Sequence, residues 1–296
     1  MLTGDRIETL GGVIERCDVP DLTGRVLLRL ARQIAASSAQ GVSREHPLLA
    51  ASLPDGSRVQ IVLPPATRGE MAIAIRKHVV AGMSLADYER SGAFSATRVT
   101  QGLASKGLRG LTPSAPDNLA SFLRTAVTER RNILIAGGTS TGKTTFLNAL
   151  LREIPREERL ILIEDTPELQ LTHANAVGLL AVRGSMGEAA VTAEDLLIAS
   201  LRMRPDRIIL GEMRGAEALT FLRAVNTGHP GSLSTIHADS PERAIDQLAL
   251  LVMQSGTAMK WEDVAQYVGN SLDIIVQLER KGGKREISSI LLRDRS

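Results

Sequence analysis

The residues with the clearest potential for chemistry lie between Gly137 and Thr145, where the chain reads GGTSTGKTT. The spacing is that of a phosphate-binding loop, G-x-x-x-x-G-K-[ST], between a strand-like run and a helix-like run. Its glycines let backbone N–H groups converge on phosphate oxygens, and the following helix N-terminus favours negative charge. The expected nucleotide-binding residues of this loop are Gly137, Gly138, Thr139, Ser140, Thr141, Gly142, Lys143, Thr144 and Thr145.

Two residues of the loop have distinct expected roles. Lys143 reaches the β- and γ-phosphates, and Thr144 places its hydroxyl on Mg²⁺. A match to this pattern arises by chance on the order of once in a hundred chains of this length, and the flanking strand and helix lower that rate. The pattern therefore predicts ATP and Mg²⁺ as ligands.

Acidic residues follow two other buried-strand runs. Glu164 and Asp165 follow Ile161–Ile163, with Glu168 one turn later, and Glu212 follows the run that ends at Gly211. Ligands of parallel sheets sit at the carboxyl ends of strands, so Glu164 and Glu212 are both candidates to orient or deprotonate water. Gly211 occupies the place where related loops carry a metal-binding aspartate, so Mg²⁺ is expected on Thr144, phosphates and water, with Glu168 as a further candidate ligand.

Basic residues supply further candidates. His237 ends the strand-like run Leu233–Ile236, where a neutral imidazole can donate to a γ-phosphate, although such a histidine often only satisfies backbone groups. Arg183 and Arg204 are candidates to neutralise phosphate charge, and surface ion pairing is the alternative for each.

Composition narrows the class of protein. The chain has 296 residues, 43% of them hydrophobic but only 2% aromatic, which suits aliphatic helices packed on a parallel sheet. The net charge of +2 does not indicate a nucleic-acid binder. The single cysteine, Cys17, excludes an internal disulfide and fits a cytoplasmic location. No signal peptide and no membrane-spanning run are expected.

The pattern of elements predicts two domains. Residues 1–108 alternate short strands with helices, including a hairpin around Pro54–Gly56, and are expected to form a smaller α+β domain. Residues 109–117, within a stretch rich in Gly, Ser and Pro, are expected to be a linker. Residues 118–296 alternate helix and strand, predicting an α/β domain with a mostly parallel sheet and a final hairpin around Gly282–Gly283.

Four segments together carry a resemblance to a known family. GGTSTGKTT, IEDTPELQ, SLRMRPDRIILGEMRG and NTGHPGSLSTIHADSPERA, in this order, resemble the traffic ATPases of type IV secretion systems. The match covers essentially residues 119–280, and the segments DGSRVQIVLPP and IAIRK resemble strands of the family's N-terminal domain more weakly.

The resemblance implies a RecA-like P-loop ATPase that works as a homo-hexameric motor. Such a motor is peripheral to the inner membrane and acts with other cytoplasmic and inner-membrane components in substrate transfer or pilus assembly. It implies an acidic motif at Glu164, Asp165 and Glu168 and a histidine motif at His229 and His237. It also implies that Arg58 and Arg76 reach the nucleotide. The family's type II branch binds zinc through paired cysteines, which this chain lacks.

Three alternatives remain open from the sequence. The chain could be a type II secretion or type IV pilus ATPase, or a RecA-type nucleic-acid motor, although seven aromatic residues offer little for base stacking. It could also be an assembly factor that binds ATP without hydrolysing it. Nucleic acid is not indicated as a partner.

Overall fold

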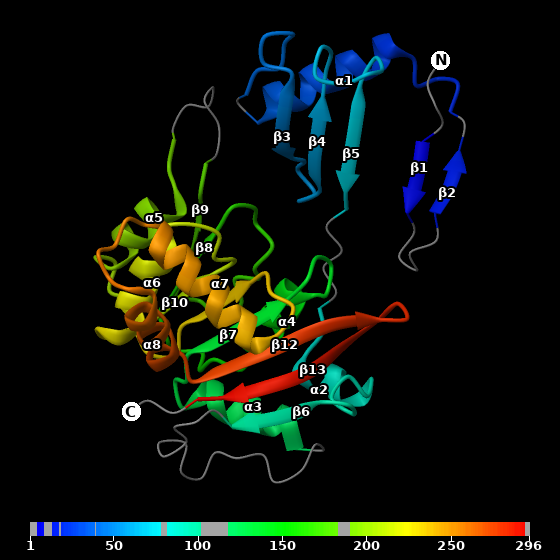
Figure 1. The fold of residues 1–296 in the computed structure, drawn as a ribbon. Helices are drawn as coiled ribbons and strands as arrows, with labels where there is room; N and C mark the ends of the chain where they lie inside the picture. Colours follow the sequence, from blue (N-terminus) through cyan, green and yellow to red (C-terminus); the bar gives the residue numbers. More distant parts are fainter. Residues whose placement is uncertain are drawn as a thin grey trace. The chain divides into compact units, whose positions relative to one another are not determined.

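The structure is a computed structural model that describes residues 5–8, 14–17, 19–38, 40–77, 82–101, 118–182 and 190–293. The chain divides into two compact units, one holding Met1–Val79 and Val182–Ala190 and the other holding Val80–Ala181 and Val191–Ser296. Figure 1 shows both, coloured along the sequence.

The first unit is a small α+β structure. Helix α1 packs on a three-stranded antiparallel sheet of order β3-β4-β5, and β1 pairs with β2 separately. Alternate residues of β4, such as Val59 and Ile61, are buried against α1, because successive side chains of a strand point to opposite faces. The elements are β1 (Asp5–Glu8), β2 (Ile14–Cys17), α1 (Gly24–Ser37), β3 (Leu48–Ser52), β4 (Arg58–Val62) and β5 (Ala72–Arg76).

The second unit is built on an eight-stranded sheet of order β6-β13-β12-β7-β11-β10-β8-β9, in which only the β12–β13 pair is antiparallel. This confirms the predicted α/β fold with a mostly parallel sheet. The helices are α2 (Leu85–Arg90), α3 (Leu119–Thr128), α4 (Lys143–Leu151), α5 (Ala193–Ser200), α6 (Glu217–Asn226), α7 (Pro241–Gln254) and α8 (Trp261–Ser271). The strands are β6 (Arg98–Gln101), β7 (Ile133–Gly137), β8 (Leu160–Glu164), β9 (Ala176–Leu180), β10 (Arg207–Leu210), β11 (Leu233–Ile236), β12 (Ile274–Lys281) and β13 (Lys284–Leu292).

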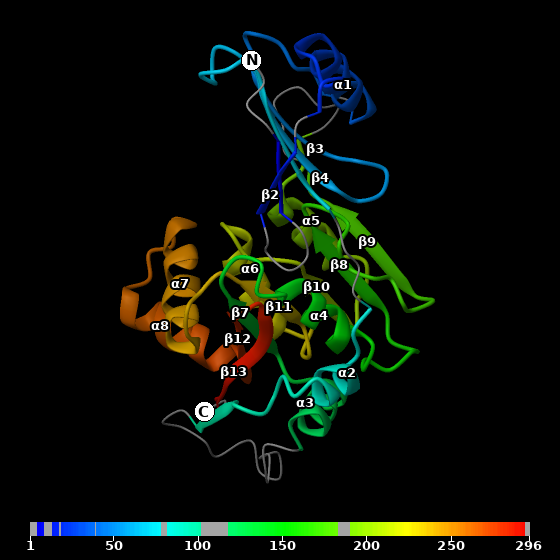
Figure 2. The ribbon, with the colours of Figure 1, turned by 90° about the vertical axis from the view of Figure 1, so that its right-hand side faces the viewer.

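Helices cover both faces of this sheet. One apolar cluster joins α2, α3 and α4 to the sheet, and a second joins α5, α6, α7 and α8 to its other face, an arrangement visible in Figure 2. The central strands β7, β8, β10 and β11 are buried along their whole lengths, which explains why they are continuous apolar runs rather than alternating ones. In the described part of the chain, no helix has both the length and the apolar character needed to cross a membrane.

The boundary between the two parts differs from the predicted one at residue 108. Strand β6 pairs with β13, and Leu85, Tyr88 and Phe94 are buried in the same cluster as α3 and α4. The described residues 82–101 therefore belong with the larger unit, because apolar side chains among them complete its core. The linker predicted at 109–117 lies outside the described residues.

A buried ion pair fixes the edge of the sheet where the parallel strands begin. The Arg207 side chain is fully buried, and its Nε and Nη2 donate to Glu158 at 2.7 and 2.8 Å. Its Nη1 donates to the carbonyl of Val127 at 2.6 Å. The guanidinium thus ties the start of β10 to the end of α3 and to the turn before β8.

Replacing Glu158 with alanine is expected to cost roughly 3–5 kcal/mol of unfolding free energy, because it leaves the Arg207 charge buried without its partner. Urea denaturation followed by the fluorescence of Trp261, the only tryptophan, reports on this unit. The matched control is Arg124→Ala, which breaks a more exposed ion pair with Glu153 and should cost about 0–1 kcal/mol. Equal destabilisation by the two substitutions would contradict the assignment.

Candidate active site

The phosphate-binding loop leaves β7 at Gly137 and enters α4 at Lys143. Gly142 caps the helix in a left-handed conformation, with φ of 95°, and Ser140 is also left-handed, at 61°. A Cβ on Gly137 would lie 2.6 Å from Thr141 Oγ1 and 2.8 Å from the Leu278 carbonyl. Glycine is required at Gly137 by space and at Gly142 by backbone conformation.

The side chain of Lys143 lies inside the loop. Its Nζ donates to the carbonyls of Gly137 and Gly138 at 2.9 and 3.1 Å, and Thr141 Oγ1 donates to Gly138 at 2.9 Å. Only 9% of the Lys143 side chain is exposed, so its charge is held within the loop rather than in solvent. The helix N-terminus and this ammonium group together make the loop a place where anions are favoured.

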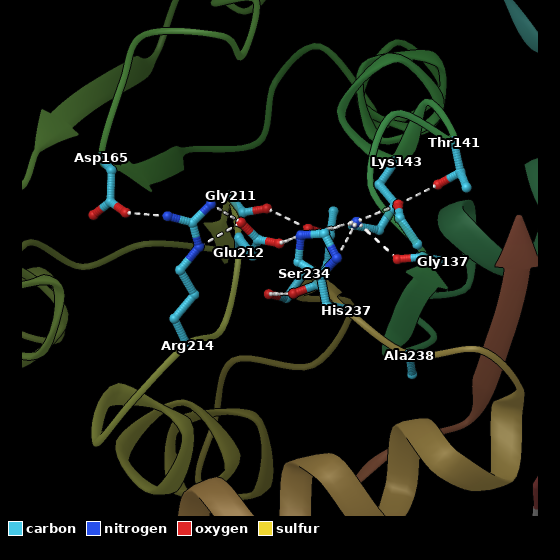
Figure 3. Close-up of polar contacts among 12 residues, drawn as sticks. Gly137, Thr141, Lys143, Asp165, Gly211, Glu212, Arg214, Ser234, His237 and Ala238 are labelled. Carbon is cyan, nitrogen blue, oxygen red and sulfur yellow. Dashed lines mark hydrogen bonds and ion pairs between the residues drawn. The ribbon is translucent and has the colours of Figure 1, made fainter. Parts of the chain in front are cut away.

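Glu212 faces the loop from the neighbouring strands. It follows β10, and its Oε1 lies 4.0 Å from Lys143 Nζ and 2.9 Å from Nε2 of His237, which follows β11. Figure 3 shows these side chains in one row. The row continues to Arg214, whose Nε donates to Glu212 Oε2 at 2.5 Å and whose Nη1 donates to Asp165 at 3.2 Å.

The backbone around Glu212 is fixed by β11 and β8. Thr235 Oγ1 donates to the Gly211 carbonyl at 2.8 Å, and the Thr235 carbonyl accepts from Met213 at 2.9 Å. A Cβ on Gly211 would lie 3.2 Å from Glu164 Cβ, which is tighter than ordinary contact. A side chain at position 211 would press on Glu164, because β8 and β10 lie side by side there.

Glu164 occupies a different environment from Glu212. Its Oε2 accepts from the N–H groups of Glu168 and Leu169, both at 2.9 Å, and its side chain is 9% exposed. One oxygen of this carboxylate is thus engaged by the loop that follows its own strand. Glu212, the other acid that the sequence proposed for activating water, lies 4.0 Å from Lys143 Nζ through its Oε1.

Glu168 belongs to a loop held by α4. Asn148 Nδ2 donates to the Glu168 carbonyl at 3.0 Å, and Asn148 Oδ1 accepts from Gln170 at 2.8 Å. The helix that begins at the phosphate loop therefore also fixes the chain after β8.

The structure does not bring all predicted residues to this edge. Arg204 precedes β10 with φ of 54°, and His229 precedes β11 with its Nδ1 3.1 Å from the Pro205 carbonyl. Both lie where β10 and β11 begin, whereas the phosphate loop lies where the parallel strands end. Arg183 lies outside the described residues. Arg58 and Arg76 belong to the first unit, where they are cross-strand partners on β4 and β5.

Sequence reasoning missed Arg214 as part of the site. It lies two residues after Glu212 in the segment GEMRG, and it joins Glu212 and Asp165 across the ends of β10 and β8. An arginine next to a strand-end carboxylate was the available signal.

The side chains around the phosphate loop fit a magnesium ion that is held mainly by phosphate. Within the described ranges, no group of three or more His, Cys, Asp or Glu side chains is arranged to hold a metal ion. Thr144, the second residue of α4, is partly exposed and offers a hydroxyl beside Lys143. Mg²⁺ commonly takes few protein ligands and completes its shell with substrate oxygens and water, which this arrangement allows.

Similarity to known proteins extends over most of the chain. Residues 23–285 match the family model described as "Type II/IV secretion system protein". The chain is 38% identical to the type IV secretion system protein VirB11 of Bartonella henselae over 288 residues, covering 92% of this chain and 81% of that protein. It is 40% identical to the type IV secretion system protein PtlH of Bordetella pertussis over 282 residues, covering 90% and 80%.

Solved structures show the same architecture. The VirB11 ATPase from the Brucella suis type IV secretion system, crystallised with sulphate, superimposes with a TM-score of 0.57 at 37% identity, covering 96% of this chain and 87% of that one. The pilus retraction motor PilT, crystallised with ADP, superimposes with a TM-score of 0.62 at 20% identity, covering 99% and 78%. The likeness to PilT shows the fold alone.

Proposed function

Because the chain belongs to the type II/IV secretion system protein family, we propose that it is a magnesium-dependent ATPase that powers a type IV secretion system. The observation that carries this proposal is the row from Lys143 through His237 and Glu212, at the point where three parallel strands end beside a phosphate-binding loop. A row of this kind combines an anion site with a carboxylate that can act on water.

In this proposal the loop residues hold the phosphates and Lys143 neutralises their charge. The amides from Gly138 to Thr145 bind the phosphate oxygens, and Lys143 exchanges its bonds to the Gly137 and Gly138 carbonyls for bonds to the β- and γ-phosphates. The Thr144 hydroxyl would be the protein ligand of Mg²⁺, which supplies charge neutralisation at the phosphates when bound.

Glu212 is proposed to orient or deprotonate the attacking water, with Glu164 as the competing candidate. Arg214 and His237 fix the Glu212 carboxylate from two directions, so its position is set before a nucleotide arrives. His237, which also lies 3.4 Å from Lys143 Nζ, is placed to respond to the terminal phosphate. Glu168 as a metal ligand and the arginines Arg58, Arg76, Arg183 and Arg204 as phosphate-binding groups remain predictions.

The assembly is proposed by similarity to the named relatives. Like them, the chain is proposed to belong to a type IV secretion system. We further propose that it acts there as a homo-hexamer in the cytoplasm at the inner membrane, as the resemblance of its motifs to the traffic ATPases implies. Its partners there would be the other cytoplasmic and inner-membrane components of the system.

The proposal is tested by steady-state phosphate release from the purified chain with ATP and Mg²⁺. We expect turnover that requires Mg²⁺ and is unchanged by added single-stranded or double-stranded DNA. Absence of turnover in a folded preparation that binds ATP would favour a non-catalytic assembly factor. Strong, salt-sensitive stimulation by DNA would instead favour a nucleic-acid motor.

A further inference from the structure

The C-terminal hairpin extends past the end of β7 and over the phosphate loop. Strand β12 runs parallel to β7, and its Leu278 is paired with Gly137, the last residue of β7. The hairpin continues beyond this point through Lys281 and returns from Lys284. Its tip therefore projects beside the loop, on the side of β7 opposite to β11 and β10.

One side chain of this tip lies directly on the loop. A Cβ built on Gly142 would meet Arg285 Cδ at 2.9 Å, Nε at 3.4 Å and Cζ at 3.8 Å. The guanidinium of Arg285 is thus in contact range of the residue that precedes Lys143 and caps α4. Arg285 is also exposed, so its charge remains available to a ligand.

Charges on the two faces of the hairpin tip differ in how they are balanced. On one face Lys281 lies opposite Lys284 and Glu279 opposite Glu286, and Lys281 pairs with Glu279 at 2.8 Å, so acids and bases are mixed there. On the other face Arg285 lies directly opposite Arg280, and the next pair along that face, Leu278 and Ile287, is apolar and buried. Like charges directly opposite each other in a sheet are unfavourable, and a bound anion would relieve that cost.

A buried hydroxyl lies close to the same place. Tyr88 packs edge-on against Phe146 of α4, with ring centroids 5.1 Å apart, and is only 2% exposed. Its hydroxyl makes no hydrogen bond within the described structure. Burial raises the pKa of Tyr88 to about 12, and the positive charge of Arg285 acts against that rise, which places the two groups within electrostatic range.

Different side chains therefore flank the phosphate loop on its two sides. Glu212 and His237 face it from the β11 side, where the terminal phosphate would meet Lys143. The remainder of a nucleotide must leave the loop away from these groups, because an acidic side chain next to the α-phosphate would repel it. Arg285 supplies the positive charge on that remaining side.

We propose that Arg285 binds the α-phosphate end of the nucleotide and so strengthens the binding of ATP and ADP equally. This inference rests on the proposed ATPase function, and it separates Arg285 from any arginine that detects the γ-phosphate. A group that contacts only what ATP and ADP share contributes to affinity without distinguishing the two.

The test is calorimetric titration of the full chain with ADP and with the non-hydrolysable β,γ-imido analogue of ATP, both with Mg²⁺. Arg285→Ala should lower the affinity for both ligands by about tenfold or more, as expected for loss of a charge-assisted hydrogen bond. In steady-state assays the same variant should raise KM and leave kcat nearly unchanged, because the interaction is present before and during the reaction.

Two further variants make the result decisive. Lys284→Ala removes a charge from the other face of the hairpin, and both affinities should stay within about twofold of the parent value. Arg285→Gln keeps the side-chain stem over Gly142 and should lose affinity as Arg285→Ala does. Unchanged Trp261 fluorescence checks that each variant is folded.

Several outcomes would overturn the inference. One is a loss of affinity for the ATP analogue alone, and another is an equal loss of affinity in Arg285→Ala and Lys284→Ala. A normal affinity in Arg285→Gln, or a lowered kcat at unchanged KM in Arg285→Ala, would also contradict it. If the parent chain binds neither nucleotide, the proposed function itself fails. Tight binding by the parent and by all variants would refute only the role of Arg285.

Discussion

The Lys143→Ala variant is expected to hydrolyse ATP at least about a hundredfold more slowly, the effect of removing one preorganised group that stabilises transition-state charge. Lys143 projects its ammonium group into the loop with only 9% of the side chain exposed, and Gly137, Gly138 and Glu212 hold it there. Without it, the developing charge on the phosphate would face the Glu212 carboxylate without the ammonium group that lies 4.0 Å from that carboxylate. Steady-state phosphate release measures the loss directly.

The variant should remain folded, because Lys143 lies at the first position of α4 and alanine is a good helix former. Lys260→Ala provides a matched control, since Lys260 precedes α8 and is exposed, and it should keep full activity. Turnover by the Lys143 variant at the parent rate would remove the basis for the proposed mechanism.

Replacing Glu212 with glutamine is expected to lower kcat by roughly 10²–10⁴-fold, the contribution of a positioned general base. Nucleotide affinity should be retained or increased, because the carboxylate lies 4.0 Å from Lys143 Nζ and competes with phosphate for that charge. Single-turnover hydrolysis and equilibrium binding, measured on the same preparation, separate the two effects.

Glu164→Gln is the comparison that decides between the two acids. Glu164 already accepts two backbone N–H groups through Oε2, so its substitution should disturb the loop after β8 more than the chemical step. A larger loss of kcat in Glu164→Gln than in Glu212→Gln would assign the water-activating role to Glu164 instead.

Local signals were sufficient for the elements that carry the site. Strand β10 occupies the apolar run Arg207–Leu210, which Asp206 and Gly211 bound on both sides. The spacing of Thr192 and Asp195 is that of a capping box, and in the structure the two side chains each bond to the other residue's backbone. Such features depend on neighbours in the chain, so the sequence displays them.

Long-range partners were not predictable in the same way. Strand β6 joins the large sheet through β13, and Thr97 donates to the carbonyl of Ile287 across 190 positions of sequence. An arginine at the start of an apolar run suggests a surface position, yet Arg207 is fully buried because Glu158 lies opposite. Contacts between distant segments decide these cases, and no local pattern encodes them.

The candidate site shows the same division. The phosphate loop and the strand-end acids followed from spacing, whereas the join that Arg214 makes between Glu212 and Asp165 required the packing of β8 against β10. The position of Arg285 could not be predicted from the sequence either, because its approach to Gly142 depends on how far the hairpin reaches beyond β7.

Asn148 gives α4 a mechanical role in addition to its electrostatic one. The helix follows the phosphate loop directly, and five residues after its start the Asn148 side-chain amide is hydrogen-bonded to the backbone of Glu168 and Gln170. A shift of the helix on phosphate arrival would therefore pull the stretch behind β8 along with it. The Glu164 carboxylate accepts a hydrogen bond from that stretch, so phosphate binding in the loop and the position of Glu164 are coupled.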